Sequence, residues 1–389
     1  MRQWAAPLSI ALSIQVVVSA ADMAVPVLGP VVTAAAGVPA AHVGYYASAV
    51  AAGAVAFYLF GASITHRYGA VRTLQIGAVL AALSLLLVLT GAWVVILLAG
   101  LLIGIGFGAN TPASAELLHR HVPPERLGLA FSVKQAGMPI GAILAGLSLP
   151  VLAQIWGWQA AILAASGLGL VAVLLVQPLR SRYDTRAPGE ANAASGTWVD
   201  LRALADLSKR ADIRRLMVYG ALLAVVQGSV NAFLVTYLVT ALGHSLVLAG
   251  SLYSLYQVIG IAGRIASGWL ADRALGRLRM LAVIGTASGA AAILLSGLTA
   301  ATPLSLIVLC VLFAGLVTGS WNGILLAEVT EAAPDGRVPE ANNVTAIGVF
   351  AGFMLGPTLF GQAITMSDFE TAFVLLAACA ALSLLALRR

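Results

Sequence analysis

The chain has 389 residues, of which 60% are hydrophobic and only 9% are charged, and its net charge is +6. Soluble domains carry about 25% charged residues, so this composition excludes a water-soluble fold and predicts an integral membrane protein. The positive net charge does not indicate nucleic-acid binding, because the basic residues gather in the short connections between apolar segments.

Twelve apolar segments are long enough to span a bilayer, which takes about 20 residues, and the first is interpreted as a retained span. The predicted spans are 6–32, 43–64, 72–92, 94–117, 128–152, 158–179, 214–240, 246–270, 279–299, 303–327, 341–364 and 371–387. We therefore predict an all-α membrane protein with a bundle over 1–179, a linker over 180–213 and a second bundle over 214–389. Aliphatic residues among charges also predict a surface helix over 198–209.

Lysine and arginine mark one side of the membrane. Of the 21 Lys and Arg residues, all but two fall at the termini, in the linker or in alternate connections. Cytoplasmic loops carry an excess of these residues, so both termini and the linker are predicted to be cytoplasmic, in a bacterial inner membrane. The two exceptions, Lys134 and Arg264, lie inside spans.

Asp22 lies in the middle of the first predicted span. A charged side chain that faces lipid at mid-helix costs at least about 2.5–3.5 kcal/mol, so such residues face protein or a water-filled cavity. Two interpretations stay open for Asp22: a carboxylate that carries a coupled proton, or a permanent ion pair with one of the two buried cations.

The two intramembrane cations lie at similar depths. At 1.5 Å per residue, Lys134 is about 10 Å from the cytoplasmic start of its span, and Arg264 is about 12 Å from Asp272 at the end of its span. The matched depth predicts that both cations bind one negative group. The alternative for Lys134 is a long side chain that snorkels to the cytoplasmic interface.

Polar residues at helical spacing accompany these charges within the spans. They are Asn110, Gln227, Asn231, Tyr253, Gln257, Trp321 and Asn322. Each alone is typical of a helix–helix hydrogen bond, but together with the cations they predict a polar pocket for a small anion. No phosphate loop, catalytic triad or metal-ligand spacing occurs in the polar segments, so we expect neither an enzyme, nor a cofactor, nor a metal.

The two halves of the chain repeat each other. The pair Asn110 and Glu116 matches Asn322 and Glu328 at an offset of 212 residues, and Arg67 matches Arg273 at an offset of 206. Gly137-x3-Gly141 likewise matches Gly348-x3-Gly352. Such repeats predict two pseudo-symmetric six-helix bundles with a substrate site near the middle of the membrane.

The stretch Gly268-Trp-Leu-Ala-Asp272-Arg273-Ala-Leu-Gly276-Arg277 resembles the cytoplasmic motif of the major facilitator superfamily, with one extra residue before Gly276. The equivalent stretch after span two has His66 where the family has aspartate. The resemblance covers essentially the whole chain, and Gly263-Arg264-x3-Gly268 is similar to the span-eight arginine of monocarboxylate and oxalate carriers. It implies alternating access, with a cytoplasmic gate formed by Arg67, Glu116, Asp272, Arg273 and Glu328.

These observations predict a monomeric secondary transporter that takes up a small organic anion, a carboxylate, together with protons. Protonation of Asp22 would raise the charge of the empty site from +1 to +2, so that proton binding and anion binding favour each other. Two alternatives stay open: a proton-driven exporter of a drug or metabolite, and a membrane receptor that binds without transporting.

Overall fold

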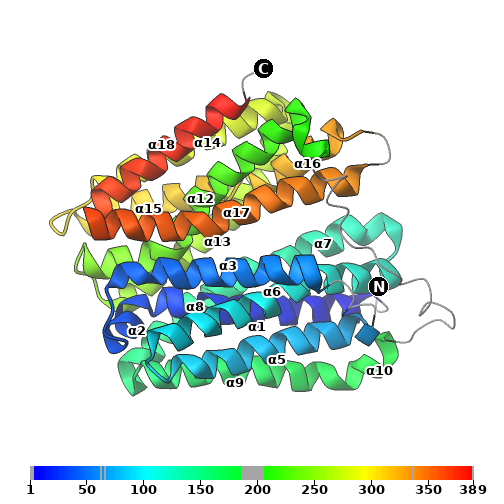
Figure 1. Ribbon diagram of the computed structural model, residues 1–389, viewed down its shortest axis with the longest axis horizontal. Helices are drawn as coiled ribbons and strands as arrows, with labels where there is room; N and C mark the ends of the chain where they lie inside the picture. The colour runs from blue at the N-terminus through cyan, green and yellow to red at the C-terminus, as the bar shows by residue number, and fades with distance from the viewer. Residues whose placement is uncertain (1–3, 62–63, 65–66, 185–205, 335–336, 388–389) are drawn as a thin grey trace. The chain divides into compact units, whose positions relative to one another are not determined.

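The structure is a computed structural model that describes residues 4–61, 64, 67–184, 206–334 and 337–387. Within these ranges every regular element is a helix (Figure 1). Twelve helical segments are long and apolar enough to cross a membrane, which confirms the predicted all-α fold with twelve spans. His66 and most of the predicted surface helix over 198–209 lie outside the described residues.

Contacts divide the chain into two units. Unit 1 comprises Met1–Val38 and Ala49–Trp198, and unit 2 comprises Pro39–Ser48 and Val199–Arg389. The helices of the first half are α1 Ala5–Val27, α2 Gly29–Ala35, α3 Val43–Phe60, α5 Ala70–Val88, α6 Trp93–His121, α7 Leu127–Gln135, α8 Gly137–Trp156, α9 Trp158–Val176 and α10 Arg180–Tyr183. The helices of the second half are α12 Ala211–Thr240, α13 Leu246–Leu270, α14 Arg277–Ser296, α15 Leu304–Thr318, α16 Asn322–Ala332, α17 Val338–Met366 and α18 Phe369–Leu387.

Glycines let the helices of unit 1 approach one another closely. A Cβ atom on Gly108 of α6 would lie 2.8 Å from the carbonyl oxygen of Ala54 on α3. A Cβ on Gly77 of α5 would lie 2.6 Å from the carbonyl oxygen of Gly106 on α6. Small residues at such crossings allow backbone-to-backbone packing inside a membrane, so the glycines of span four serve helix packing.

Spans one, five and ten are interrupted within the described ranges. Span one breaks at Leu28 between α1 and α2, span five at Ala136 between α7 and α8, and span ten between Thr318 and Asn322. The break in span five directly precedes the Gly137-x-Pro139 sequence, which loosens a helix because proline provides no N–H donor. Span eleven, by contrast, runs unbroken as α17 through Gly356-Pro357.

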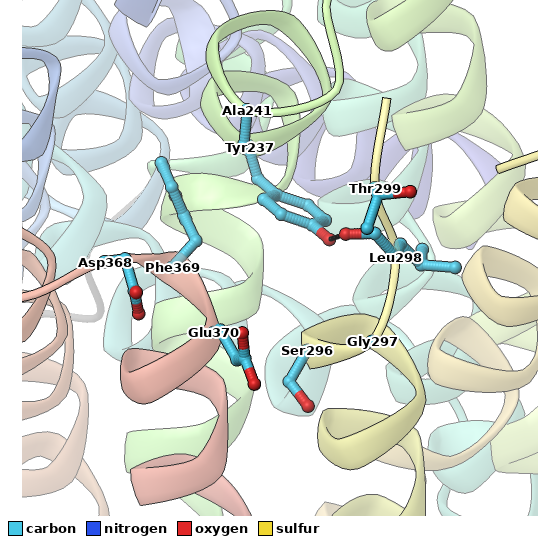
Figure 2. Close-up of a pocket in the computed structure, with 9 residues that line it drawn as sticks. All are labelled: Tyr237, Ala241, Ser296, Gly297, Leu298, Thr299, Asp368, Phe369 and Glu370. Atoms are coloured by element: carbon cyan, nitrogen blue, oxygen red, sulfur yellow. Dashed lines mark hydrogen bonds between the residues drawn. The ribbon is translucent and has the colours of Figure 1, made fainter. Parts of the chain in front are cut away.

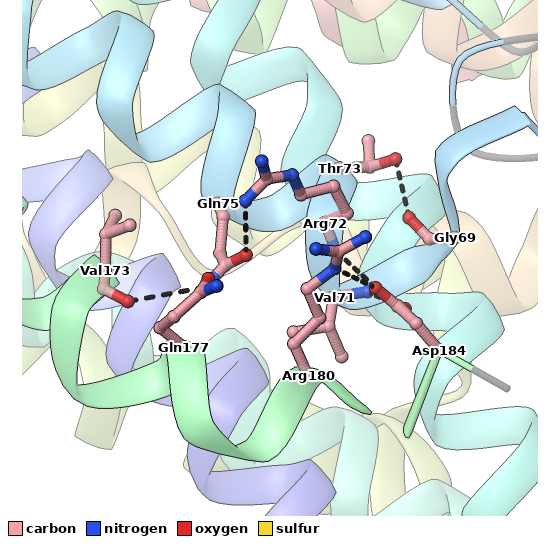
Figure 3. A network of polar contacts seen from close by, with 9 residues as sticks. All are labelled: Gly69, Val71, Arg72, Thr73, Gln75, Val173, Gln177, Arg180 and Asp184. Atoms are coloured by element: carbon pink, nitrogen blue, oxygen red, sulfur yellow. Dashed lines mark hydrogen bonds and ion pairs between the residues drawn. The ribbon is translucent and has the colours of Figure 1, made fainter. Parts of the chain in front are cut away.

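A carboxylate from the end of span six fixes the start of span three. Figure 3 shows Asp184, which follows α10, beneath the first turn of α5. Its two oxygens accept hydrogen bonds from the backbone N–H groups of Val71 at 2.8 Å and Arg72 at 2.9 Å. Arg180 pairs with the same carboxylate at 3.5 Å. The acidic group thus satisfies orphan N–H groups at the positive end of a helix.

Candidate functional site

The interruption of span ten exposes backbone carbonyl groups in the interior of unit 2. The residues between α15 and α16 are Gly319, Ser320 and Trp321, and the indole of Trp321 is fully buried. Backbone groups freed at membrane depth must find new partners. The carbonyl of Thr318 accepts from Nε1 of Trp321 at 3.0 Å, and that of Ser320 accepts from the Ser267 hydroxyl at 3.2 Å.

Arg264 of α13 satisfies the third freed carbonyl. Its Nε donates to the carbonyl oxygen of Gly319 at 3.1 Å. The reach is short because α13 and α15 touch through glycines: a Cβ on Gly315 would lie 2.5 Å from the carbonyl oxygen of Tyr256. Among the described residues, no carboxylate lies within ion-pair distance of Arg264, and its terminal nitrogens have no hydrogen-bond partner.

Amide side chains of α12 and α13 surround this region. Nδ2 of Asn322, the first residue of α16, donates to Oε1 of Gln227 at 3.1 Å. Nε2 of Gln257 donates to Oδ1 of Asn231 at 3.1 Å and to the hydroxyl of Tyr253 at 2.8 Å. Six predicted site residues of unit 2 therefore fall into the break or into these two hydrogen-bonded sets. They are Tyr253, Gln257, Gln227, Asn231, Trp321 and Asn322.

Sequence reasoning missed the residues that hold the break together. Tyr256 is buried, and its hydroxyl bonds with the hydroxyl of Thr318 at 2.7 Å. Gly319 and Ser267 contribute through a carbonyl and a hydroxyl. The signal that could have found them is the run Thr318-Gly-Ser-Trp-Asn-Gly323, in which small and polar residues replace the aliphatic residues expected at mid-span.

The predicted cation of unit 1 is buried at the end of α7. Lys134 is 2% exposed, and its Nζ donates to Oε1 of Gln135 at 3.1 Å. Its position in the last turn of α7 suits a cation, because the C-terminal end of a helix carries partial negative charge. No carboxylate of the described residues pairs with it. The burial of Lys134 argues against snorkelling, the alternative interpretation.

Asp22 and Asn110 complete the candidate residues of unit 1. Among the described residues, Asp22 has neither a hydrogen-bond nor an ion-pair partner, so the structure does not support a permanent ion pair between Asp22 and Lys134. Asn110 of α6 is 2% exposed, and neither atom of its amide has a partner in the described part of the chain.

The residues predicted to form the cytoplasmic gate are placed as follows. Asp272 lies 3.9 Å from Arg277, which also pairs with Glu331. The guanidinium of Arg273 lies 5.6 Å from the ring centre of Trp269, and that of Arg67 lies 5.4 Å from the ring centre of Tyr68. Glu116 pairs with Arg120 at 3.1 Å. Glu328 lines a pocket of about 440 Å³ beside Asp272 and Arg277.

The extra residue of this motif is taken up by a π-helical turn over Ala271–Leu275. The N–H of Gly276 donates to the carbonyl of Ala271, five residues earlier, at 3.0 Å. Gly276 follows with a φ of +77°, and α14 begins at the next residue. The insertion that distinguishes this motif therefore has a definite structural form.

A second pocket, of about 430 Å³, lies where α14 ends and α18 begins (Figure 2). Its charged residues are the carboxylates Asp368 and Glu370, and the hydroxyl of Tyr237 points to the backbone carbonyl of Leu295 at 2.6 Å. Hydrogen bonds from Thr371 hold the pKa of Asp368 below its usual range, so the carboxylate stays ionised. This pocket suits no anion and contains none of the predicted site residues.

Comparisons with known proteins agree with this architecture. A family model described as Major Facilitator Superfamily matches residues 10–342. An uncharacterised MFS-type transporter of Mycobacterium tuberculosis is 27% identical over 351 residues, which cover 87% of this chain and 74% of that protein. Monocarboxylate transporter 13 of Rattus norvegicus is 26% identical over 315 residues, covering 77% of this chain and 68% of that protein. The nucleoside transporter NupG has a TM-score of 0.77 at 16% identity, covering 100% of this chain and 98% of that one; this likeness concerns the fold alone.

Proposed function

Since the chain belongs to the Major Facilitator Superfamily, a family of membrane transporters, we propose that it takes up a small organic anion with a carboxylate group. Transport proceeds by alternating access and is coupled to protons. Family membership supports transport by alternating access. The chemistry of the buried charges supports an anionic substrate and coupling to protons.

The observation that carries the proposal is the lack of a partner for the terminal nitrogens of Arg264 among the described residues. A guanidinium inside a membrane protein is expensive unless it is paired. Arg264 uses Nε for the Gly319 carbonyl and has no carboxylate partner among the described residues. Its terminal nitrogens form a planar fork that matches a carboxylate in two parallel hydrogen bonds. A substrate carboxylate is therefore the natural counter-ion.

Lys134 supplies the second positive charge of the proposal. It is buried and has no acidic partner among the described residues. An ammonium is a compact point charge and sets little geometric requirement, so Lys134 contributes electrostatic attraction while Arg264 sets orientation. The rat relative named as a monocarboxylate transporter supports the same substrate class.

Asp22 is the residue proposed to carry the coupled proton. It is a carboxylate within a span and has no partner in the described part of the chain. Protonation removes a negative charge that would compete with the substrate, and a bound anion in turn favours the protonated form. Uptake driven by a proton gradient follows from this mutual stabilisation.

A thermal-shift screen on the purified protein tests the substrate class. The panel is pyruvate, L-lactate, oxalate, succinate and benzoate, each matched with its uncharged ester or amide. A ligand that binds the folded state stabilises it by mass action, by about 2.7 kcal/mol at 100 times its dissociation constant. We expect at least one carboxylate to raise the melting temperature and its neutral analogue to leave it unchanged. Equal shifts by both forms, or no shift by any carboxylate, would contradict the proposal.

Proteoliposomes then separate transport from binding and uptake from export. We expect the stabilising carboxylate to accumulate inside vesicles whose interior is more alkaline than the medium, and to exchange in counterflow without a pH gradient. A carboxylate that binds but shows no counterflow would indicate a receptor. Accumulation only with the pH gradient reversed would indicate proton-driven export.

A further inference from the structure

Two side-chain nitrogens from different helices approach the same point beside Gly319. A Cβ atom on this glycine would lie 3.3 Å from Nη2 of Arg264 and 3.3 Å from Nε2 of Gln227. The two 3.3 Å distances place the nitrogens no more than 6.6 Å apart. One oxygen accepts hydrogen bonds from two nitrogens when each distance is about 2.7–3.2 Å, and the point defined by this Cβ lies only slightly farther than that from both nitrogens.

Gln227 has an unused donor in a buried place. Its side chain is only 7% exposed. Its Oε1 accepts the hydrogen bond of Asn322 Nδ2, and its amide nitrogen Nε2 faces Gly319. Among the described residues, Nε2 has no acceptor. A buried donor without an acceptor is costly, and a ligand oxygen would remove that cost.

Arg264 presents a matching edge. Because Nε is held by the Gly319 carbonyl, the guanidinium is fixed in orientation, and the edge formed by Nη1 and Nη2 stays available. Gly319 has φ −105° and ψ 4°, angles that alanine can adopt, so the backbone does not explain a glycine here. The space beside the two nitrogens does.

We propose that Gly319 and Gln227 form part of the binding site for the substrate carboxylate. The absence of a side chain at Gly319 lets Nη2 of Arg264 and Nε2 of Gln227 share one carboxylate oxygen, while Nη1 of Arg264 binds the other. This inference rests on the proposed function of Arg264. It adds a third donor, contributed by α12, and a steric requirement imposed by the break in span ten.

The test measures the affinity of three glycine and glutamine variants for one probe, the carboxylate of the screening panel that stabilises the wild type most. Gly319→Ala places a methyl group between the two donors and should weaken binding about 10-fold or more, because the substrate oxygen loses a charge-assisted hydrogen bond. Gln227→Glu keeps the acceptor for Asn322 but replaces the donor with an acceptor, and should weaken binding at least as much. Gly323→Ala is the matched control, because a Cβ there meets no atom within 4 Å.

The outcomes distinguish this inference from the function on which it rests. If Arg264→Ala loses binding while Gly319→Ala and Gln227→Glu both bind like Gly323→Ala, the binding role of Gly319 and Gln227 is wrong and the anion function stands. If Arg264→Ala binds as the wild type does, or no panel carboxylate binds, the anion function fails and this inference with it. Should Gly319→Ala not survive purification, Gln227→Met takes its place, because it removes the Nε2 donor without adding a charge beside Arg264.

Discussion

Span four and span ten occupy equivalent places in the two repeated halves, but only span ten is interrupted. α6 runs without a break through Asn110, whereas α15 ends at Thr318 and α16 begins at Asn322. The Asn and Glu residues of the repeat are kept at an offset of 212. What differs is the backbone before the asparagine, and with it the number of carbonyl groups open to a side chain.

The side chains that bind to these two spans from a neighbouring helix also differ. The offset of 206 that relates Arg67 to Arg273 also relates Tyr58 to Arg264. Tyr58 hydrogen-bonds with the side chain of Thr111 on the unbroken α6, while Arg264 binds a backbone carbonyl at the break. A broken helix thus gives a buried arginine a backbone carbonyl that no N–H group of its own helix occupies. The second half carries the cation proposed to orient the substrate, and the first half carries the carboxylate proposed to take up the proton.

The largest expected effect concerns proton coupling at Asp22 in the first half. Asp22→Asn should abolish pH-driven accumulation of the stabilising carboxylate, because the amide cannot take up the coupled proton. Counterflow should persist, since anion binding no longer requires protonation. Accumulation in proteoliposomes with an alkaline interior is the measurement. Undiminished accumulation in Asp22→Asn would move the coupling residue elsewhere.

The next largest effect compares substitutions at Arg264 and at Tyr58, its counterpart in the first half, by their effect on carboxylate affinity. Arg264→Ala should weaken carboxylate binding by about 2–5 kcal/mol, the cost of removing one partner of a desolvated charge pair. Arg264→Lys should weaken it substantially as well, because the planar fork is lost. Tyr58→Phe is the control and should bind normally. Affinities come from titration of each purified variant, and a normal affinity of Arg264→Lys would show that only charge matters.

Lys134 should respond differently from Arg264 to a conservative change. Lys134→Ala should weaken binding severely, by about 2 kcal/mol or more. Lys134→Arg should weaken binding less than Lys134→Ala does if the lysine acts as a point charge. The same titrations measure both variants. If Lys134→Ala and Arg264→Ala both bound the carboxylate with wild-type affinity, the anion hypothesis would be wrong.

The smallest effect compares the two asparagines of the repeat. Asn322→Ala removes the hydrogen bond to Gln227 and should lower the free energy of unfolding by about 0.5–1.5 kcal/mol. Asn110→Ala removes an amide that has no partner among the described residues, so its stability should change by less than about 0.5 kcal/mol. Chemical denaturation in detergent measures both. A larger loss for Asn110→Ala would reveal a bound group at that amide.

The sequence was sufficient for the fold because each span is a continuous apolar run of the length that a bilayer requires. A charged or amide side chain at mid-span is conspicuous, so the sequence also singled out individual candidate residues, whose roles in binding stay predictions. The break in span ten was not predictable in the same way. Gly319, Ser320 and Trp321 are all compatible with a membrane helix, and the interruption is stabilised by Arg264, Ser267 and Tyr256 from a neighbouring helix, which no local pattern reports.

The gate motif shows a second limit of this kind. The sequence pattern showed one extra residue before Gly276. It did not predict whether this residue would lengthen the loop or form a bulge in the helix. The pairing of Arg277 with both Asp272 and Glu331 depends on the answer. It brings together residues that lie more than fifty positions apart in the chain, a relation that spacing within the motif does not contain.

The π-helical turn over Ala271–Leu275 has a consequence for the orientation of the helix that follows it. One residue inserted into an α-helix turns everything after it by about 100°, a quarter-turn or more at 3.6 residues per turn. A bulge with a five-residue hydrogen bond confines that rotation to a single turn, and Gly276 then lets α14 start afresh. An extra residue in this motif therefore need not rotate α14, so spacing counted in residues does not by itself report where the side chains of such a motif lie in space.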